Sequence, residues 1–194
     1  TNSTATGFES KAIGDFSQAF GYKARAFDDY STAIGNNASA NGYSSYALGD
    51  YSESKGEASY AFGTGAFALG LRSFAFGSIG IDSAGAPTGN TKAIGEYSYA
   101  MGMGSVADAK GAFAMGTQDT ASGNYSLSMG YQSVSSGNWG STAIGYKSVA
   151  SGEGSIAMGN QVVAEGHTST ALGLYAKALG HHSTALGREL TASG

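Results

Sequence analysis

The chain has 194 residues, a formal net charge of −4, no cysteine, and 32 glycines against a single proline. This balance gives no electrostatic reason to bind nucleic acid or an anionic membrane, and no run of apolar residues is long enough to cross a bilayer. Without cysteine no disulfide can form, the glycines lack the three-residue period of collagen, and 11% aromatic residues argue against simple disorder.

In chain order, the first feature is a glycine that returns every seven residues. We call these the marker glycines; they stand at positions 7, 14, 21, 35, 42, 49, 56, 63, 70, 77, 95, 102, 116, 123, 130, 137, 145, 152, 159, 166, 173, 180, 187 and 194. Asp28 and Ala109 stand at the two missing steps. Such a period over a whole chain predicts a repeat architecture.

The segments between marker glycines favour strands over helices. Glycine costs about 1 kcal/mol relative to alanine in a helix interior, and here it would recur every two turns. In the segments 31–35, 45–49 and 183–187, small residues alternate with larger ones, which is the two-residue period of a strand. Each seven-residue unit is therefore predicted to be a short strand followed by a tight turn of Asp, Asn, Gly, Ser or Tyr.

The larger period is fourteen. The residue before every second marker glycine is large and apolar, whereas the interleaved positions are mostly polar, for example Asn41, Lys55, Asp108 and Glu165. Two units then make one coil, and successive coils stack with parallel pairing into two sheets. We expect an all-β parallel β-roll solenoid of about 13 coils of 14 residues.

The register breaks twice. Gly77 and Gly95 are eighteen residues apart, and because the apolar series resumes at Met101, the stretch between them is predicted to be one half-coil with an inserted loop around 78–92. A one-residue break follows near 138–139. Neither break disturbs the alternation, so we expect a single domain over 1–194.

The coil interior is expected to hold only Ala, Ser and Gly, which leaves the large apolar residues on one outer face. Tyr, Phe, Leu and Ile flank them, at positions 46, 60, 74, 99, 113, 127 and 156. A soluble monomer does not tolerate so large an exposed apolar surface, and a homo-oligomer would bury it around a symmetry axis. The predicted core of that oligomer consists of Phe20, Ile34, Leu48, Phe62, Phe76, Met101, Met115, Met129, Ile144, Met158, Leu172 and Leu186.

The recurring Ser-x-Ala-Φ-Gly unit, where Φ is apolar, occurs as SSYALG, GSTAIG, GSIAMG and TSTALG. It resembles the head repeat of the trimeric autotransporter adhesins, the YadA-like head, over essentially the whole chain except the 78–92 insertion. The resemblance implies a left-handed β-roll, a homotrimer, and the apolar face on the trimer axis. It also implies display on a bacterial cell surface, beyond a stalk and an outer-membrane barrel absent from this chain, and virulence-related adhesion to a host matrix protein or cell-surface receptor, such as an immunoglobulin-like cell-adhesion molecule.

Two candidate binding surfaces stand out from the residues. Phe67 and Leu69 are apolar on a face where most positions are polar, and the fourteen-residue stacking places Lys92 and Ile94 beside them. With Ile81 and Pro87 of the inserted loop they form one hypothetical partner patch; the alternative is that the loop folds down and covers Phe67 and Leu69. The second candidate is a row of exposed turn aromatics, whose alternative role is stacking between coils: Tyr22, Tyr30, Tyr43, Tyr51, Tyr131, Trp139, Tyr146 and Tyr175.

No pattern indicates catalysis, a cofactor or a metal. The Gly-x-Gly pairs at 63–65 and 102–104 are explained by the repeat rather than by phosphate binding. His167, His181 and His182 should cluster and could hold a metal, but solvated turn residues explain them better. We therefore expect a non-enzymatic adhesin head, with a structural spacer or a phage tail-fibre segment as the alternatives.

Overall fold

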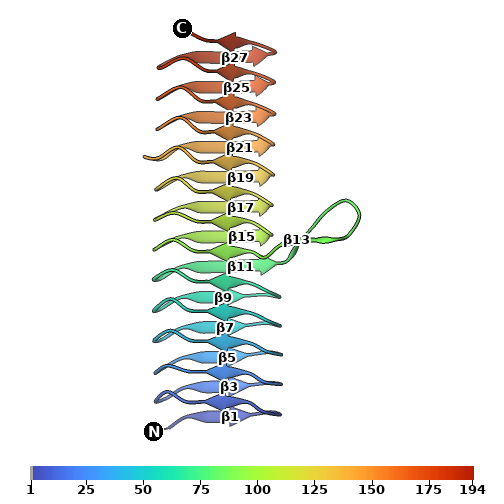
Figure 1. The fold of residues 1–194 in the computed structure, drawn as a ribbon, viewed down its shortest axis with the longest axis vertical. Coiled ribbons are helices and arrows are strands. Elements are labelled where there is room, and N and C mark those ends of the chain that lie inside the picture. The colour runs from blue at the N-terminus through green and yellow to red at the C-terminus, as the bar shows by residue number, and fades with distance from the viewer. Residues whose placement is uncertain (1) are drawn as a thin grey trace. The chain divides into compact units, whose positions relative to one another are not determined.

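The computed structural model describes residues 2–194 as β-strands and turns. The chain forms two compact units, residues 1–104 and 105–194. Each unit is a parallel β-solenoid whose coils carry one longer and one shorter strand, joined by tight turns (Figure 1). The predicted fold class is confirmed. Within residues 2–194, no helix is long and apolar enough to span a membrane.

In the first unit, the longer strands pair in parallel, in the order β1 (Thr4–Thr6), β3 (Gln18–Phe20), β5 (Thr32–Ile34), β7 (Tyr46–Leu48), β9 (Tyr60–Phe62), β11 (Phe74–Ser78) and β15 (Tyr99–Met103). The shorter strands form a second parallel sheet, in the order β2 (Lys11–Ala12), β4 (Arg25–Ala26), β6 (Ser39–Ala40), β8 (Glu53–Ser54), β10 (Phe67–Ala68) and β14 (Lys92–Ala93). We call these the long-strand and short-strand sheets. Residues fourteen apart are direct partners, as in the pairing of Thr32 with Tyr46.

The second unit repeats this arrangement. Its long-strand sheet has the order β17 (Phe113–Thr117), β19 (Leu127–Tyr131), β21 (Thr142–Tyr146), β23 (Ile156–Asn160), β25 (Thr170–Leu174) and β27 (Thr184–Arg188). Its short-strand sheet has the order β16 (Val106–Ala107), β18 (Thr120–Ala121), β20 (Val134–Ser135), β22 (Val149–Ala150), β24 (Val163–Ala164), β26 (Lys177–Ala178) and β28 (Thr191–Ala192). Gly130 pairs with Gly145, fifteen residues on, so the turn between β20 and β21 absorbs the extra residue.

Turns lie on two opposite edges of each unit. We call those that follow a longer strand exit turns and those that lead into one entry turns. The residue two positions after a marker glycine commonly adopts the left-handed conformation, as Lys23 does in an exit turn (φ 54°) and Arg72 in an entry turn (φ 50°). This one left-handed residue reverses the chain within a tight turn.

The marker glycines of the long-strand sheet are required by the stacking. Gly35 has a φ of +135°, and a Cβ atom there would stand 2.5 Å from the carbonyl oxygen of Gly49 in the next coil. Only glycine combines this backbone conformation with such a close approach of two main chains. The seven-residue spacing of these glycines therefore reflects the close contact between neighbouring coils.

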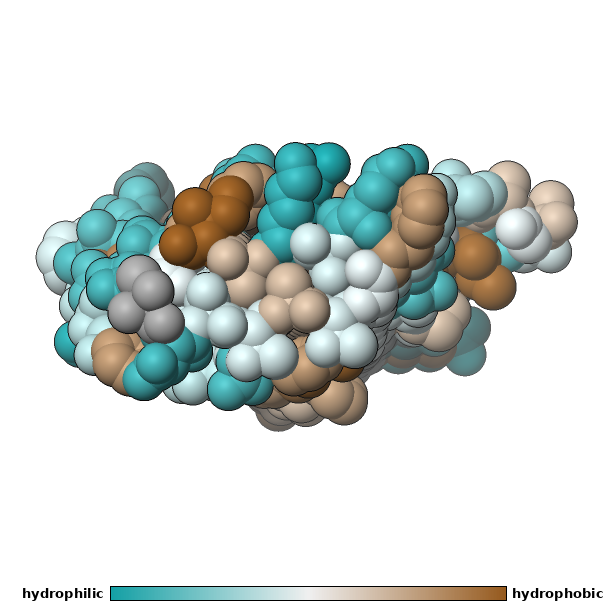
Figure 2. Space-filling view, turned by 90° about the horizontal axis from the view of Figure 1, so that it is seen from below, coloured by the Kyte–Doolittle hydropathy of each residue, from teal (hydrophilic) through white to brown (hydrophobic). Residues whose placement is uncertain are grey.

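The interior is narrow and consists almost entirely of buried Ala and Ser side chains. Figure 2, which views the first unit from its N-terminal end, shows pale small residues in the centre and the strongly apolar atoms at the periphery. Three interior residues depart from the predicted Ala, Ser and Gly composition, namely Thr91, Asp119 and Val162. Each occupies the inward position that follows a turn, where neighbouring coils carry Ser or Ala.

The insertion forms a hairpin that we call the arm. Its strands β12 (Gly80–Ile81) and β13 (Pro87–Gly89) pair antiparallel between β11 and β14. The arm leaves the first unit at its exit edge and projects sideways, as both Figure 1 and Figure 2 show. Residues 81–88 are exposed, so in this structure the arm does not cover the short-strand sheet as the alternative interpretation had it.

Candidate functional site

The large apolar residues before the marker glycines lie on the outer face of the long-strand sheet in both units, and we call them the apolar stripe. In the first unit the stripe includes Ile34, 42% exposed, and Phe76, 52% exposed. In the second unit Met158 is 40% exposed and Leu186 is 67% exposed. Direct strand pairing places stripe residues in register, for example Met129 beside Ile144. A single chain therefore presents a ladder of apolar side chains to solvent.

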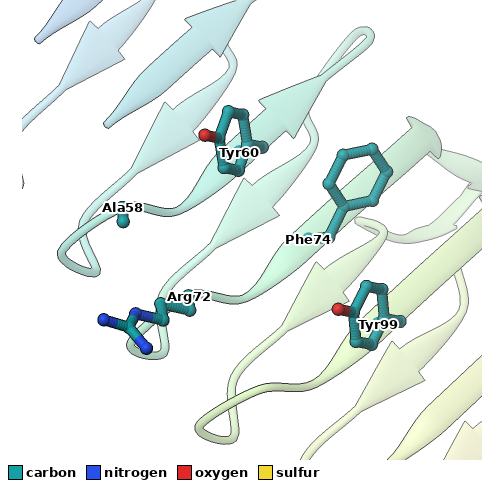
Figure 3. A pocket seen from close by; sticks show the side chains of 5 residues that line it. All are labelled: Ala58, Tyr60, Arg72, Phe74 and Tyr99. Carbon is teal, nitrogen blue, oxygen red and sulfur yellow. The ribbon is translucent and has the colours of Figure 1, made fainter. Parts of the chain in front are cut away.

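A column of aromatic rings runs beside the stripe in the first unit. The rings of Tyr46 and Tyr60 stack in parallel with centroids 5.1 Å apart. Further along, the stacking opens: the Tyr60–Phe74 and Phe74–Tyr99 centroids are 6.1 and 6.3 Å apart, and the rings are tilted by 38° and 33°. Between these rings lies a hollow of about 300 Å³ (Figure 3). It is lined by the three rings and by Ala58 and Arg72 of the entry turns.

On the short-strand sheet, the structure brings the predicted outer-face residues together. Phe67 pairs with Glu53 on one side and with Lys92 on the other. Leu69 and Ile94 stand two residues further along, directly after the ends of β10 and β14, and Ile94 is 37% exposed. The Lys55 ammonium lies 3.0 Å from the Glu53 carboxylate, so this acid is already paired at the border of the patch.

Ile81 and Pro87 lie apart from these four residues, opposite one another on the arm, where Ile81 is 47% exposed. The arm is well defined by hydrogen bonds at its tip and base. At the tip, Asp82 Oδ1 accepts from the amides of Ala84 and Ala86 at 2.9 and 2.8 Å. At the base, the Thr91 hydroxyl donates to the Ser78 carbonyl at 2.8 Å. The arm is therefore a hydrogen-bonded β-hairpin.

The prediction of one row of turn aromatics is wrong in its geometry. Tyr131 and Tyr146 end the long strands β19 and β21 at the exit edge, and their rings stack at 5.3 Å. Trp139 lies in the entry turn before β21, on the opposite edge, and is 73% exposed. The seven-residue spacing hides this division because successive turns alternate between the edges. Stacking between coils also joins Phe16 to Tyr30 at 5.3 Å.

The histidines of the second unit gather on its entry edge. The rings of His167 and His181 lie 6.1 Å apart, His182 is hydrogen bonded to Thr168, and His167 Nε2 lies 3.7 Å from the Glu153 carboxylate. In the described part of the chain, no group of three or more His, Cys, Asp or Glu residues is arranged to hold a metal ion.

Asp119 was not singled out from the sequence, although it stands three residues after Gly116, where the repeat has Ser or Ala. Its side chain is fully buried in the second unit. Oδ1 accepts from the Ser133 amide at 2.8 Å, whereas Oδ2 has no hydrogen-bond partner. Burial raises the pKa of this carboxyl from 3.8 to about 6, although backbone amides oppose the shift.

The family model for the YadA head domain repeat matches residues 12–38, 54–78, 93–118, 121–138, 140–161 and 164–189. The chain belongs to the YadA head family. The matched segments cover coils in both units and leave out the arm. A search of curated proteins finds no match to this YadA-type head.

Proposed function

We propose that this YadA-type head assembles as a homotrimer on a bacterial cell surface and binds a host matrix protein or receptor. The exposed apolar stripe carries the proposal, because Phe76 and Leu186 each leave half or more of their surface in solvent. Burying such a stripe against two further copies stabilises the assembly by about 25 cal/mol for each Å² of apolar surface that is removed from water. Family membership supports an adhesive rather than an enzymatic role.

The proposed receptor surface is the patch of Phe67, Leu69, Lys92 and Ile94. It lies on the short-strand sheet, which faces away from the stripe and stays accessible in a trimer that closes on the long strands. An apolar centre with a cation at its border is a common composition for a protein interface. Three copies would act together, so each contact can be weak while the whole binds firmly.

Trp139 on the entry edge of the second unit, and the pair Tyr131 and Tyr146 on its exit edge, are two further proposed contacts. Tyr and Trp give large contact area at small entropic cost. Because Tyr131 and Tyr146 already stack on one another, they offer a rigid surface.

Solid-phase binding tests the proposal directly. The head is applied to immobilised collagen, fibronectin and immunoglobulin-like receptor domains, and any ligand that binds is then tested with a Phe67→Ser, Ile94→Ser double variant. We expect at least a tenfold loss of binding, with Val134→Ser on the short-strand sheet of the second unit as the matched control. If no ligand of these classes binds a correctly assembled head, the structural-spacer alternative is the better description.

A further inference from the structure

The aromatic hollow of the first unit is an unfilled site on the proposed assembly face. Its rings come from three successive long strands, β9, β11 and β15, and Figure 3 shows them projecting on one side of the sheet. Tyr60 and Tyr99 are 36% and 44% exposed. The Arg72 side chain lies at the rim, with its guanidinium directed away from the rings (Figure 3). Within residues 2–194 this guanidinium has no ion-pair partner.

The arm belongs to the same coil as the hollow but leaves from the opposite edge. Strand β11 begins with Phe74, in the centre of the hollow, and ends with Ser78, where the arm begins. Six extended residues from Ser78 to the tip span about 20 Å, which is comparable to the width of the sheet. The arm therefore reaches well past the exit edge of its own protomer.

Threefold symmetry relates these two features. When identical sheets close around an axis through the same face, each contact is heterologous, so the exit edge of one protomer meets the entry edge of the next. The symmetry keeps equal coils at equal height along the axis. The arm of one protomer consequently arrives at the height of β11 of its neighbour, beside the entry turn that carries Arg72.

The chemistry of the two parts is complementary. The arm presents Ile81 and Pro87 on paired strands, and these match the aromatic rings of the hollow. Asp82 Oδ1 is held by two backbone amides, and the carboxylate carries the negative charge that Arg72 at the rim would attract. Glu57 and Glu96 occupy the entry turns on either side of the one that carries Arg72, and Arg72 is the positively charged residue among those that line the hollow.

We propose that the arm of one protomer seats in the aromatic hollow of the next, forming three identical clasps around the head. The inference rests on the proposed homotrimer. Because the arm is already ordered by its own hydrogen bonds, little conformational entropy is lost when it docks. The clasp gives the arm a structural role in assembly, and the receptor patch on the short-strand sheet remains free.

Cysteine pairing tests the clasp, because the natural chain contains no cysteine. Ala86→Cys on the arm is combined with Ala58→Cys at the hollow, and the purified head is oxidised mildly and run on a denaturing gel without reductant. We expect covalent dimers and trimers of the chain. Each single variant should remain monomeric on the gel, as should the matched pair Ala86→Cys with Asn37→Cys, which lies in an exit turn.

The mass of the same samples by light scattering separates the possible failures. A native trimer that forms no cross-link overturns the clasp and leaves the homotrimer standing, and this is also the result if the hollow or the arm serves an outside partner. A native mass of one chain overturns the homotrimer itself.

A charge exchange gives an independent readout. Arg72→Glu and Asp82→Lys should each lower the temperature at which the trimer dissociates, and the double variant should lose clearly less than the sum of the two single losses, because the exchanged charges attract again while the two amide contacts of Asp82 stay lost. If the two losses simply add, Arg72 and Asp82 do not meet, and the proposed seating is wrong.

Discussion

Gly145 lies directly beneath Gly159, so closely that a Cβ atom on Gly145 would stand 1.9 Å from the Gly159 carbonyl oxygen. The contact repeats from coil to coil within each unit, for example from Gly21 to Gly35 and from Gly159 to Gly173. The spacing of a parallel sheet leaves no room for a side chain here, and the positive φ of these residues is strained for any residue other than glycine. The heptad glycine of the sequence is thus the point where neighbouring coils touch.

Gly145→Ala is therefore expected to be severely destabilising. The new methyl group meets backbone, which cannot move aside, and the φ of +126° strains alanine in addition. We expect a loss of more than about 3 kcal/mol, measured by urea unfolding. Gly89→Ala is the matched control, because a Cβ atom there meets nothing within 4 Å; equal losses at the two sites would contradict the stacking explanation.

The buried Asp119 carboxyl is expected to give the folding stability an unusual pH dependence. Its folded-state pKa of about 6 lies above the ordinary value of 3.8, so between these values the folded chain holds a proton that the unfolded chain has lost. Above pH 6 the ionised carboxyl therefore lowers the free energy of unfolding by its full amount. As the pH falls toward 4 this destabilisation disappears. The difference amounts to at most about 3 kcal/mol per chain, because solvent screening reduces it.

Substitution isolates this contribution. Ser105 and Ser133, at the same place in the adjacent coils, donate to the carbonyl oxygens of Gly116 and Gly145, which an ionised aspartate cannot do. Asp119→Ser should raise the thermal unfolding temperature at pH 7.5 and flatten its dependence on pH between 4 and 7. An unchanged pH profile would mean that another group titrates in this range.

A charged side chain introduced into the apolar stripe is expected to disrupt the oligomer. Met129→Glu places a carboxylate on the long-strand face, where the proposed homotrimer would have to bury three of them at its axis. Charges buried without partners cost several kcal/mol each, so we expect dissociation into monomers, measured by light scattering. Ser151→Glu, directly after β22 on the short-strand side of the same unit, should leave the oligomer intact. A Met129→Glu variant that stays oligomeric would place the interface elsewhere.

Much of the fold follows from periodicity alone. The seven-residue glycine and the two-residue alternation predict the strands, and the fourteen-residue period predicts which strands pair, as the partnership of Phe67 with Lys92 across the insertion illustrates. These features are predictable because stacking repeats the same local contacts in every coil. The YadA-type repeat motif is recognisable for the same reason.

What departs from the repeat was harder to predict. The direction of the arm depends on individual hydrogen bonds, such as the one that the Asn90 side-chain amide donates to the Gly65 carbonyl at 2.8 Å. The sequence period carries no information about such bonds. The hollow beside Arg72 arises where ring stacking opens between Tyr60 and Tyr99, and this depends on side-chain angles. Asp119 could have been noticed by aligning the inward positions, since it breaks their Ser and Ala composition.

The mass of the purified chain in solution, measured by light scattering, tests most directly whether the apolar stripe is an inter-chain core. Three times the 19.4 kDa of one chain is expected, with no smaller species at micromolar concentration. A well-behaved monomer would mean that the stripe is stable in water. The homotrimer, the clasp and the adhesin proposal built on them would then all have to be abandoned.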